Sequence, residues 1–332
     1  MCKNNDIIPF ISVIIPIKNE EKYIKKFLQN LIEQTFSKDK CEFIFCDGNS
    51  CDKTLDILKE FKSNNSINIK LLSNEKENAP SGVNLGIRNA KGEIIIRLDA
   101  HTFYPKEYIE KNVYYLLNSD ADNVGCPIDT IGEGLIGKII AYIYSSKFGV
   151  GNSKFRVSNY NGFVDTVPFG CFRKKIIDEV GFFDENLPRS EDNDFNYRIR
   201  KNGGKVLMFN EIKTEYHSRS NISSLCKMGY GNGKGIVDLL KKNKESIGFR
   251  HLVPFIFVLG NLLGFIFICL KLPILKEMYL IIIGIYFLLD LFFSFKGIPK
   301  FNLIECLICF MLFPLLHICY GMGSLISFIK RR

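Results

Sequence analysis

The chain has 332 residues and a formal net charge of +9, enough sequence for one large domain or two smaller ones. Its 11 cysteines are scattered, and no pair suggests a zinc site, because Cys306 and Cys309 lie in an apolar run where packing is expected. We therefore expect free thiols in a reducing compartment. No helix-turn-helix, zinc-finger or aromatic RNA-binding pattern accompanies the positive charge, so no nucleic-acid partner is expected.

Strand and helix patterns alternate along roughly the first hundred residues. Runs such as "ISVIIPI" (11–17) are continuously apolar and rich in β-branched residues, as buried parallel strands are. Such alternation predicts an α/β domain in which helices cover both faces of a parallel sheet. The expected strands are 11–17, 41–47, 67–73 and 93–99, and the expected helices are 20–35, 53–62 and 80–90.

Polar residues stand where these strands end. They are Asn19 (a candidate helix cap) with Glu20, then Asp47, then Asp99 with His101. Ligands of parallel sheets bind beyond the carboxyl ends of the strands, so we expect these side chains to meet in one crevice. Asp99 and His101 lie two positions apart and point the same way, so they could hold a divalent cation or form a solvated turn.

The pattern is less regular between residues 105 and 220. We expect helices at 105–118 and 133–147, a polar loop at 151–162, short strands within 164–174 and a helix at 190–203. The last of these has Ser190 as a candidate N-cap, acidic residues in its first turn and Gly203 at its end, which are strong start and stop signals.

Three apolar runs follow near the C-terminus, at 252–270, 278–295 and 306–329. The first has no charge over 19 positions, about the length that crosses a bilayer core. We expect a membrane module at 251–332 with two to three apolar helices. Three full spans would put the basic C-terminus outside, against the positive-inside bias, whereas Pro314 could turn the last run into a re-entrant or interfacial hairpin.

A basic segment at 221–250 precedes this module and includes Lys227 and Lys234. Its apolar positions allow an amphipathic helix in the membrane interface, where lysines meet anionic lipid heads. The N-terminus lacks a signal-peptide pattern, so the residues before the module are expected in the cytoplasm. Asp290 and His317 are polar within apolar runs and could face a lipid-acceptor groove or a neighbouring helix.

Four motifs in register resemble the family-two inverting glycosyltransferases: "VIIPIKNE" (13–20), "CDGNSCDKT" (46–54), "LDAH" (98–101) and "SEDND" (190–194). The "DAH" form, "VDTVPFG" and "HICYGMG" look most like membrane-bound succinoglycan-type exopolysaccharide glucosyltransferases. The resemblance implies that residues 1–220 form a GT-A catalytic domain, a Rossmann-like mixed α/β sheet that binds a nucleotide-diphospho-sugar, followed by transmembrane helices.

The resemblance also implies roles for donor-side residues. Asp47 would accept from the uracil imide, although "DGNS" could be only a tight turn. The implied nucleotide-binding set is Pro16, Ile17, Glu20, Asp47, Arg97 and Asp99, and the implied ligands of Mn²⁺ or Mg²⁺ are Asp99, His101 and His217. Glu20 could instead favour a helix start by its charge, Arg97 could hold a carboxylate or a phosphate, and His217 could be an ordinary surface histidine.

On the acceptor side, Asp192 would be the catalytic base, with Glu191 supporting it and Asp194 orienting the acceptor. These acids could instead only stabilise a helix start. Lys227 and Lys234 could meet an acceptor diphosphate or only touch lipid heads. The chain has no tryptophan, so the Gln-x-x-Arg-Trp motif of processive relatives is absent and addition of a single sugar is expected.

Together these features predict a metal-dependent, inverting hexosyltransferase in the plasma (inner) membrane, multi-pass, with its catalytic domain in the cytoplasm. It would move a hexose from a UDP-sugar, with UDP-glucose as the first candidate, to a polyprenyl-diphosphate-linked saccharide in surface-glycan assembly. A polyprenyl phosphate or glycerolipid acceptor is an alternative. A non-catalytic membrane sensor that binds nucleotides is another.

Overall fold

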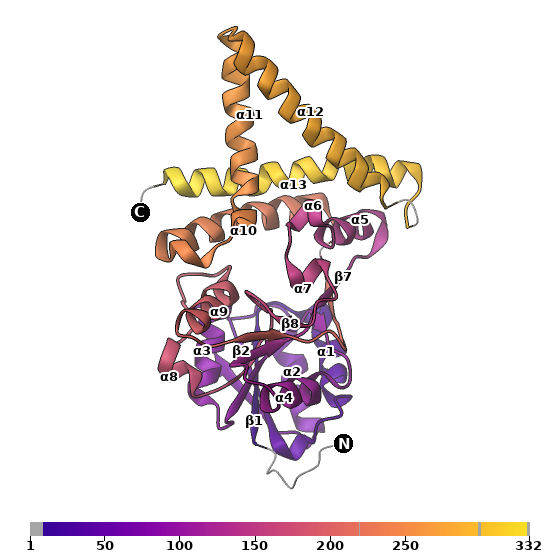
Figure 1. Cartoon of the computed structure of the whole chain (residues 1–332). Helices are drawn as coiled ribbons and strands as arrows, with labels where there is room; N and C mark the ends of the chain where they lie inside the picture. The colour runs from indigo at the N-terminus through magenta and orange to yellow at the C-terminus, as the bar shows by residue number, and fades with distance from the viewer. Residues whose placement is uncertain (1–8, 219, 298–299, 331–332) are drawn as a thin grey trace. The chain divides into compact units, whose positions relative to one another are not determined.

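The computed structural model describes residues 9–218, 220–297 and 300–330. The chain forms two compact units, the first within Met1–Ile128 and Asn159–Tyr216 and the second within Asp129–Ser158 and His217–Arg332 (Figure 1). Residues 129–158, expected in the first domain, therefore fold with the C-terminal helices. They do so because Ile139, Ile140 and Ile143 pack into the same core as the last helix.

The first unit is built on a mixed eight-stranded sheet of order β3-β2-β1-β4-β9-β6-β10-β8. β1 pairs in parallel with β2 and β4, whereas β9 runs antiparallel to β4 and β6. The strands are β1 (Ile11–Ile17), β2 (Cys41–Asp47), β3 (Ile69–Ser73), β4 (Ile94–Arg97), β6 (Asn123–Gly125), β8 (Gly162–Phe163), β9 (Cys171–Arg173) and β10 (Val206–Met208).

Helices cover both faces of this sheet. α1 packs on α2, while α3 packs on β1 and β2. Right-handed crossovers place α3 opposite α1 and α2, because the chain reverses direction along the sheet after β3. The helices are α1 (Glu21–Ile32), α2 (Thr54–Asn64), α3 (Ala79–Asn89), α4 (Tyr108–Leu117), α8 (Ile176–Val180) and α9 (Glu191–Lys201). The strand order reverses between β1 and β4, which is where such sheets bind ligands.

Of the two predicted helix caps, Ser190 stands at the N-cap position of α9 without a side-chain cap bond, and Asn19 lies one residue before the N-cap of α1. Asn19 and Ser190 both have left-handed backbone, with φ of 54° and 66°, whereas capping residues take extended backbone. Asn19 instead accepts a hydrogen bond from the Cys51 amide, and Ser190 makes no side-chain cap bond to α9. The expected 151–162 loop is also partly helical, since it contains α7 (Lys154–Val157).

The remaining three strands are short. β5 (Thr102–Phe103) pairs antiparallel with β11 (Thr214–His217), and β7 spans Ile128–Ile131. The second unit then contains α5 (Gly134–Tyr144), α6 (Lys147–Val150), α7, α10 (Ile222–Lys242), α11 (Val253–Cys269), α12 (Pro273–Phe295) and α13 (Leu303–Ile329). α10 packs along α13, and α11 and α12 form a helical hairpin (Figure 1).

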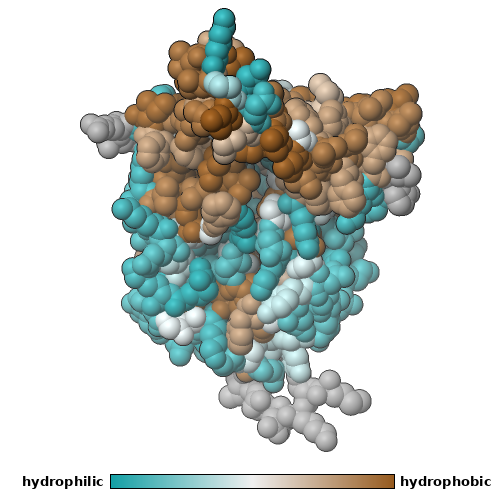
Figure 2. Space-filling view, turned by 45° about the horizontal axis from the view of Figure 1, so that its top comes forward, coloured by the Kyte–Doolittle hydropathy of each residue, from teal (hydrophilic) through white to brown (hydrophobic). Residues whose placement is uncertain are grey.

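The last apolar run is one continuous helix, so of the two alternatives the hairpin turn at Pro314 is not the one formed. Neighbouring residues Phe313 and Leu316 are buried in the core shared with α5, which supports the helix on both sides of the proline. α12 and α13 are long and apolar enough to cross a membrane, and apolar surface gathers over this unit (Figure 2).

The polar residues within these apolar runs are buried in the helical unit. His317 Nε2 donates to the Phe148 carbonyl at 2.9 Å, and its Nδ1 accepts from the Tyr286 hydroxyl at 2.9 Å. Asp290 is fully buried and accepts from Ser294 Oγ at 3.2 Å. Of the two surroundings that the sequence left open, His317 therefore has the neighbouring helices, whereas the bond of Asp290 is to its own helix.

Candidate active site

The ends of β1 and β2 form one connected polar loop system. Asp47 directly follows Cys46 in β2, beside Ile17 of β1, and its carboxylate accepts from Ser50 Oγ at 2.5 Å and from the Ser50 amide at 3.2 Å. Ser50 Oγ in turn accepts from the Asn19 amide at 2.9 Å. The turn expected at "DGNS" is thus present. Because a carboxylate has about four acceptor positions, Asp47 keeps capacity for a further donor.

A buried arginine gathers the acidic residues. Arg97, at the end of β4, is 4% exposed. Its Nη1 donates to Asp192 Oδ1 at 2.7 Å, and its Nη2 donates to Glu191 Oε1 at 3.0 Å and lies 3.4 Å from Asp99 Oδ1. Of the two partners that the sequence allowed for Arg97, the structure shows the carboxylates. The cluster joins "LDAH" to "SEDND", which are about 90 residues apart in sequence.

The charges of this Arg97 cluster do not balance, since three carboxylates face one guanidinium. Burial, together with the charges of Glu191 and Asp99, raises the pKa of Asp192 to about 7, although the Arg97 guanidinium opposes the shift. A carboxyl group with a pKa near neutrality is well suited to general base catalysis. The excess negative charge also favours a bound cation.

His101 lies at the same edge and contacts Glu20, with its Nδ1 3.1 Å from Glu20 Oε1. Because a carboxylate oxygen can only accept, Nδ1 carries the proton in the neutral ring and Nε2 carries the lone pair that a metal requires. Asp99 is held nearby by its amide, which donates to the Tyr104 hydroxyl at 2.8 Å. Within the described ranges, no three His, Cys, Asp or Glu side chains lie close enough to hold a metal by themselves.

The remaining predicted residues lie on α9, α10, β11 and β1. Asp194 is fully buried, and its carboxylate pairs with Arg198 at 2.9 Å, one turn along α9. Its role in orienting the acceptor stays a prediction. Lys227 and Lys234 are exposed on α10, in the second unit, and His217 ends β11, where the chain enters that unit. The predicted Pro16 and Ile17 lie in β1.

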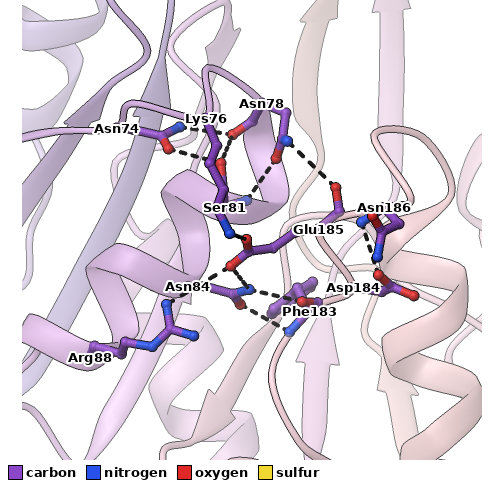
Figure 3. A network of polar contacts seen from close by, with 10 residues as sticks. All are labelled: Asn74, Lys76, Asn78, Ser81, Asn84, Arg88, Phe183, Asp184, Glu185 and Asn186. Atoms are coloured by element: carbon purple, nitrogen blue, oxygen red, sulfur yellow. Dashed lines mark hydrogen bonds and ion pairs between the residues drawn. The ribbon is translucent and has the colours of Figure 1, made fainter.

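A polar network anchors the loop that leads into α9 (Figure 3). Asn84, 1% exposed on α3, donates to the Phe183 carbonyl at 2.8 Å and accepts from the Phe183 amide at 2.9 Å. It also donates to Glu185 Oε1 at 2.9 Å, and Lys76 pairs with Glu185 Oε2 at 2.5 Å. Lys76 belongs to the loop 74–78, which also reaches the end of β1, where Glu77 pairs with Lys18 at 2.5 Å.

Sequence reasoning missed Asn84 and Glu185. Only their positions in space show that they hold the segment before Asp192. Backbone strain gave a further signal that sequence could not supply. Asn19, Asn49, Glu77 and Ser190 have positive φ, and such residues cluster at functional sites.

Two solved structures share the fold. The mannosyltransferase PcManGT from Pyrobaculum calidifontis, in complex with GDP-Man and Mn²⁺, has a TM-score of 0.61 at 14% identity and covers 98% of this chain and 89% of that one. S. aureus TarS 1–349 in complex with UDP-GlcNAc has a TM-score of 0.53 at 17% identity, covering 95% and 90%. The predicted GT-A-like α/β fold is confirmed.

Curated relatives agree. A Methanococcus voltae dolichyl N-acetyl-alpha-D-glucosaminyl phosphate 3-beta-D-2,3-diacetamido-2,3-dideoxy-beta-D-glucuronosyltransferase is 34% identical over 76% of this chain and 81% of its own length. Succinoglycan biosynthesis protein ExoA of Rhizobium meliloti is 27% identical over 73% of each chain. Residues 12–181 match the family described as glycosyl transferase family 2, and the chain belongs to this family, as its four motifs indicated.

Proposed function

We propose that the chain is a membrane-associated, metal-dependent, inverting glycosyltransferase that moves a hexose from a UDP-sugar to a lipid-linked saccharide. The Arg97 cluster is the observation that carries this proposal. It joins Asp99, suited to the donor diphosphate, to Asp192, suited to activate an acceptor, through one buried guanidinium. A non-catalytic sensor would not need an ion-pair network between a diphosphate-binding residue and a catalytic base.

The reaction follows from these positions. Asp192 takes the proton of the acceptor hydroxyl, whose oxygen forms a bond to the anomeric carbon. The bond from that carbon to the diphosphate breaks on the opposite face, and UDP leaves with the bonding electrons, which inverts the configuration. Glu191 and Arg97 keep Asp192 in place, since both belong to the same ion-pair network. Asp47 receives the uracil imide N–H.

A divalent cation fits the donor side. Asp99 supplies a carboxylate, and Glu20 holds His101 in the tautomer whose Nε2 can ligate, so Glu20 serves this histidine rather than the nucleoside. Two protein ligands suffice when diphosphate oxygens and water complete the shell, as is usual for Mg²⁺ and Mn²⁺. The bound cation would neutralise charge that develops on the leaving diphosphate. His217 remains a proposed third ligand.

His101→Asp is expected to change the metal preference. Imidazole suits Mn²⁺ better than Mg²⁺, and carboxylate suits Mg²⁺, so the ratio of Mg²⁺- to Mn²⁺-supported activity should rise. The measurement is a titration of each metal into chelated, washed enzyme. His251→Asp, outside the first unit, is the matched control and should leave the ratio unchanged. An unchanged ratio in His101→Asp would remove His101 from the metal site.

The acceptor is proposed from the relatives. The M. voltae enzyme is named for an acceptor sugar on dolichyl phosphate, and ExoA is named for succinoglycan biosynthesis. We therefore propose a polyprenyl-diphosphate-linked saccharide, with a polyprenyl monophosphate carrier as the second candidate because the first relative's name specifies a monophosphate. Lys227 and Lys234 are proposed to meet that phosphate. Basic residues beside the apolar helices favour a cytoplasmic catalytic unit at the plasma membrane.

The direct test is UDP release from membranes carrying the protein. A panel of UDP-sugars, beginning with UDP-glucose, would be supplied with Mn²⁺, with and without a lipid-linked saccharide extract and a chelator. Release that requires both the extract and the metal supports the proposal and names the donor. Nucleotide binding without release for every donor and both carrier types would favour the sensor.

Asn84→Asp is expected to lower kcat by roughly 10- to 100-fold with little change in KM for the donor. The new carboxylate would face the Phe183 carbonyl and the Glu185 carboxylate, where Asn84 now donates, and would displace the segment before Asp192. Asn89→Asp is the control, because among the described residues the Asn89 side chain bonds Leu85 of α3 and Lys70 of β3 and lies outside this network. Adding Glu185→Gln should restore part of kcat. If kcat is not restored and the KM for the donor rises by as large a factor as kcat falls, this role is contradicted.

A further inference from the structure

We propose that only the α11–α12 hairpin crosses the bilayer, while α13 lies along the membrane interface. One face of α13 would contact lipid through an apolar stripe that consists of Ile304, Leu307, Met311, Ile318 and Ile329. Both ends of the helical unit would then stay on one side of the membrane. This membrane placement involves the second unit alone and does not depend on which sugar or acceptor the protein uses.

α13 is bound to α10 along most of its length. A Cβ at Gly233 would lie 1.9 Å from the Tyr320 carbonyl oxygen, and a Cβ at Gly323 would lie 2.1 Å from that of Tyr230, so the backbones touch. Small residues allow this close approach in membrane helices. Ser324 Oγ also donates to the Gly233 carbonyl at 3.0 Å.

Contacts further along confirm that the two helices run parallel. Ser327 Oγ donates to Asp238 Oδ1 at 3.1 Å, and Lys241 Nζ donates to the Ser327 carbonyl at 2.6 Å. Later residues of α10 thus meet later residues of α13. The two helices must therefore have the same orientation relative to the membrane.

α10 is too polar to cross. Lys227, Lys234 and Lys241 recur every seven residues, close to two helical turns, and so form a row along one face. All three are exposed. In a spanning helix this row would extend over about 20 Å of depth, and charged side chains facing lipid near the bilayer centre are strongly disfavoured. Because α10 cannot cross, its partner α13 does not cross either.

The two faces of α13 differ in the way an interfacial helix requires. Cys309, Leu312 and Leu316 are buried towards the rest of the unit. The stripe is exposed, with Ile304 at 67%, Met311 at 68% and Ile329 at 68%. α11 meets α13 beside this stripe, since a Cβ at Gly321, one turn after Ile318, would lie 2.2 Å from the Pro254 carbonyl oxygen. The stripe and the hairpin therefore share the side away from α10.

The hairpin is suited to cross. Only 11% of the 18-residue apolar stretch of α12 is buried inside the protein, and α11 buries little beyond Val258 and Gly264. Positive charge is concentrated at the hairpin base, at Arg250, Lys296 and Lys300, and continues in the α10 row, whereas the tip carries Lys271, Lys276 and Glu277. This asymmetry places the base in the cytoplasm. With α13 in the interface, the basic C-terminus also stays there, which removes the conflict created by three spans.

The absence of tryptophan makes a clean depth measurement possible. Single Ile304→Trp, Met311→Trp, Ile318→Trp and Ile329→Trp variants of the full chain would be placed in phosphatidylethanolamine–phosphatidylglycerol vesicles. Lipids brominated near the headgroup or near the chain end would quench their fluorescence. Ile274→Trp, Ile281→Trp and Leu288→Trp, spaced by about 10 Å along exposed α12, are the matched spanning set.

The four α13 tryptophans are expected to be quenched alike, and more by shallow than by deep bromine, whereas the α12 set should show a depth gradient. A gradient along α13, or no quenching there, would overturn the proposal. Epitope tags give an independent test, because their result does not depend on whether the tryptophan variants fold. Tags at both chain ends should lie on one side and a tag after Leu270 on the other; any other distribution contradicts the proposal.

Discussion

Asp192→Asn should reduce transfer turnover by ~10²–10⁴-fold while nucleotide affinity changes by no more than a few-fold. The amide keeps the volume of the carboxylate and can still accept from Arg97 Nη1, so the Arg97 cluster should persist. It cannot take the acceptor's proton. The measurement is kcat from UDP release at saturating donor and acceptor, beside UDP affinity by calorimetry.

The matched control for this variant is Asp178→Asn, which changes an exposed carboxylate on α8 and should leave turnover unchanged. Turnover within a few-fold of the parent in Asp192→Asn would transfer the role of base to Glu191 or to another group. The parent should also lose kcat as the pH falls through about 7, because the raised pKa of Asp192 leaves it protonated below that value. Above it, kcat should level off.

The sequence predicted well which polar residues lie at the strand ends, because that placement is local. Each of these residues follows an apolar strand, and parallel strands bring their carboxyl ends to one edge. Asp47, Asp99 and His101 could therefore be placed at that edge from strand patterns alone. The motif "SEDND" required the family resemblance, because nothing in a helix start indicates that it will meet Arg97.

Other features were beyond sequence reasoning because they depend on contacts between distant segments. Asn84 and Phe183 are 99 positions apart, and no local pattern links a buried amide to a loop backbone. Residues 129–158 fold with the C-terminal helices through Ile139 and its neighbours, which look like any amphipathic core face. The apolar run of α13 resembles a span by composition, and only its glycine contacts with α10 indicate otherwise.

Arg97→Gln should strongly destabilise the first unit. Arg97 faces three carboxylates with its side chain 5% exposed, and removal of one partner from a buried ion-pair network typically costs about 3–5 kcal/mol. For a domain of this size that loss corresponds to a Tm lower by roughly 10 °C. The measurement is thermal unfolding of the detergent-solubilised protein.

The pH dependence of this loss separates charge from packing. With Arg97 absent, the carboxylates of Asp99, Glu191 and Asp192 repel one another only when ionised, so the Tm difference from the parent should shrink as pH falls from 8 to about 5. A difference independent of pH would mean that lost packing, and not uncompensated charge, dominates. Arg88→Gln is the control: its side chain is 53% exposed and lies 3.9 Å from Glu185, a long and partly exposed pair worth about 1 kcal/mol or less, so its Tm should change little.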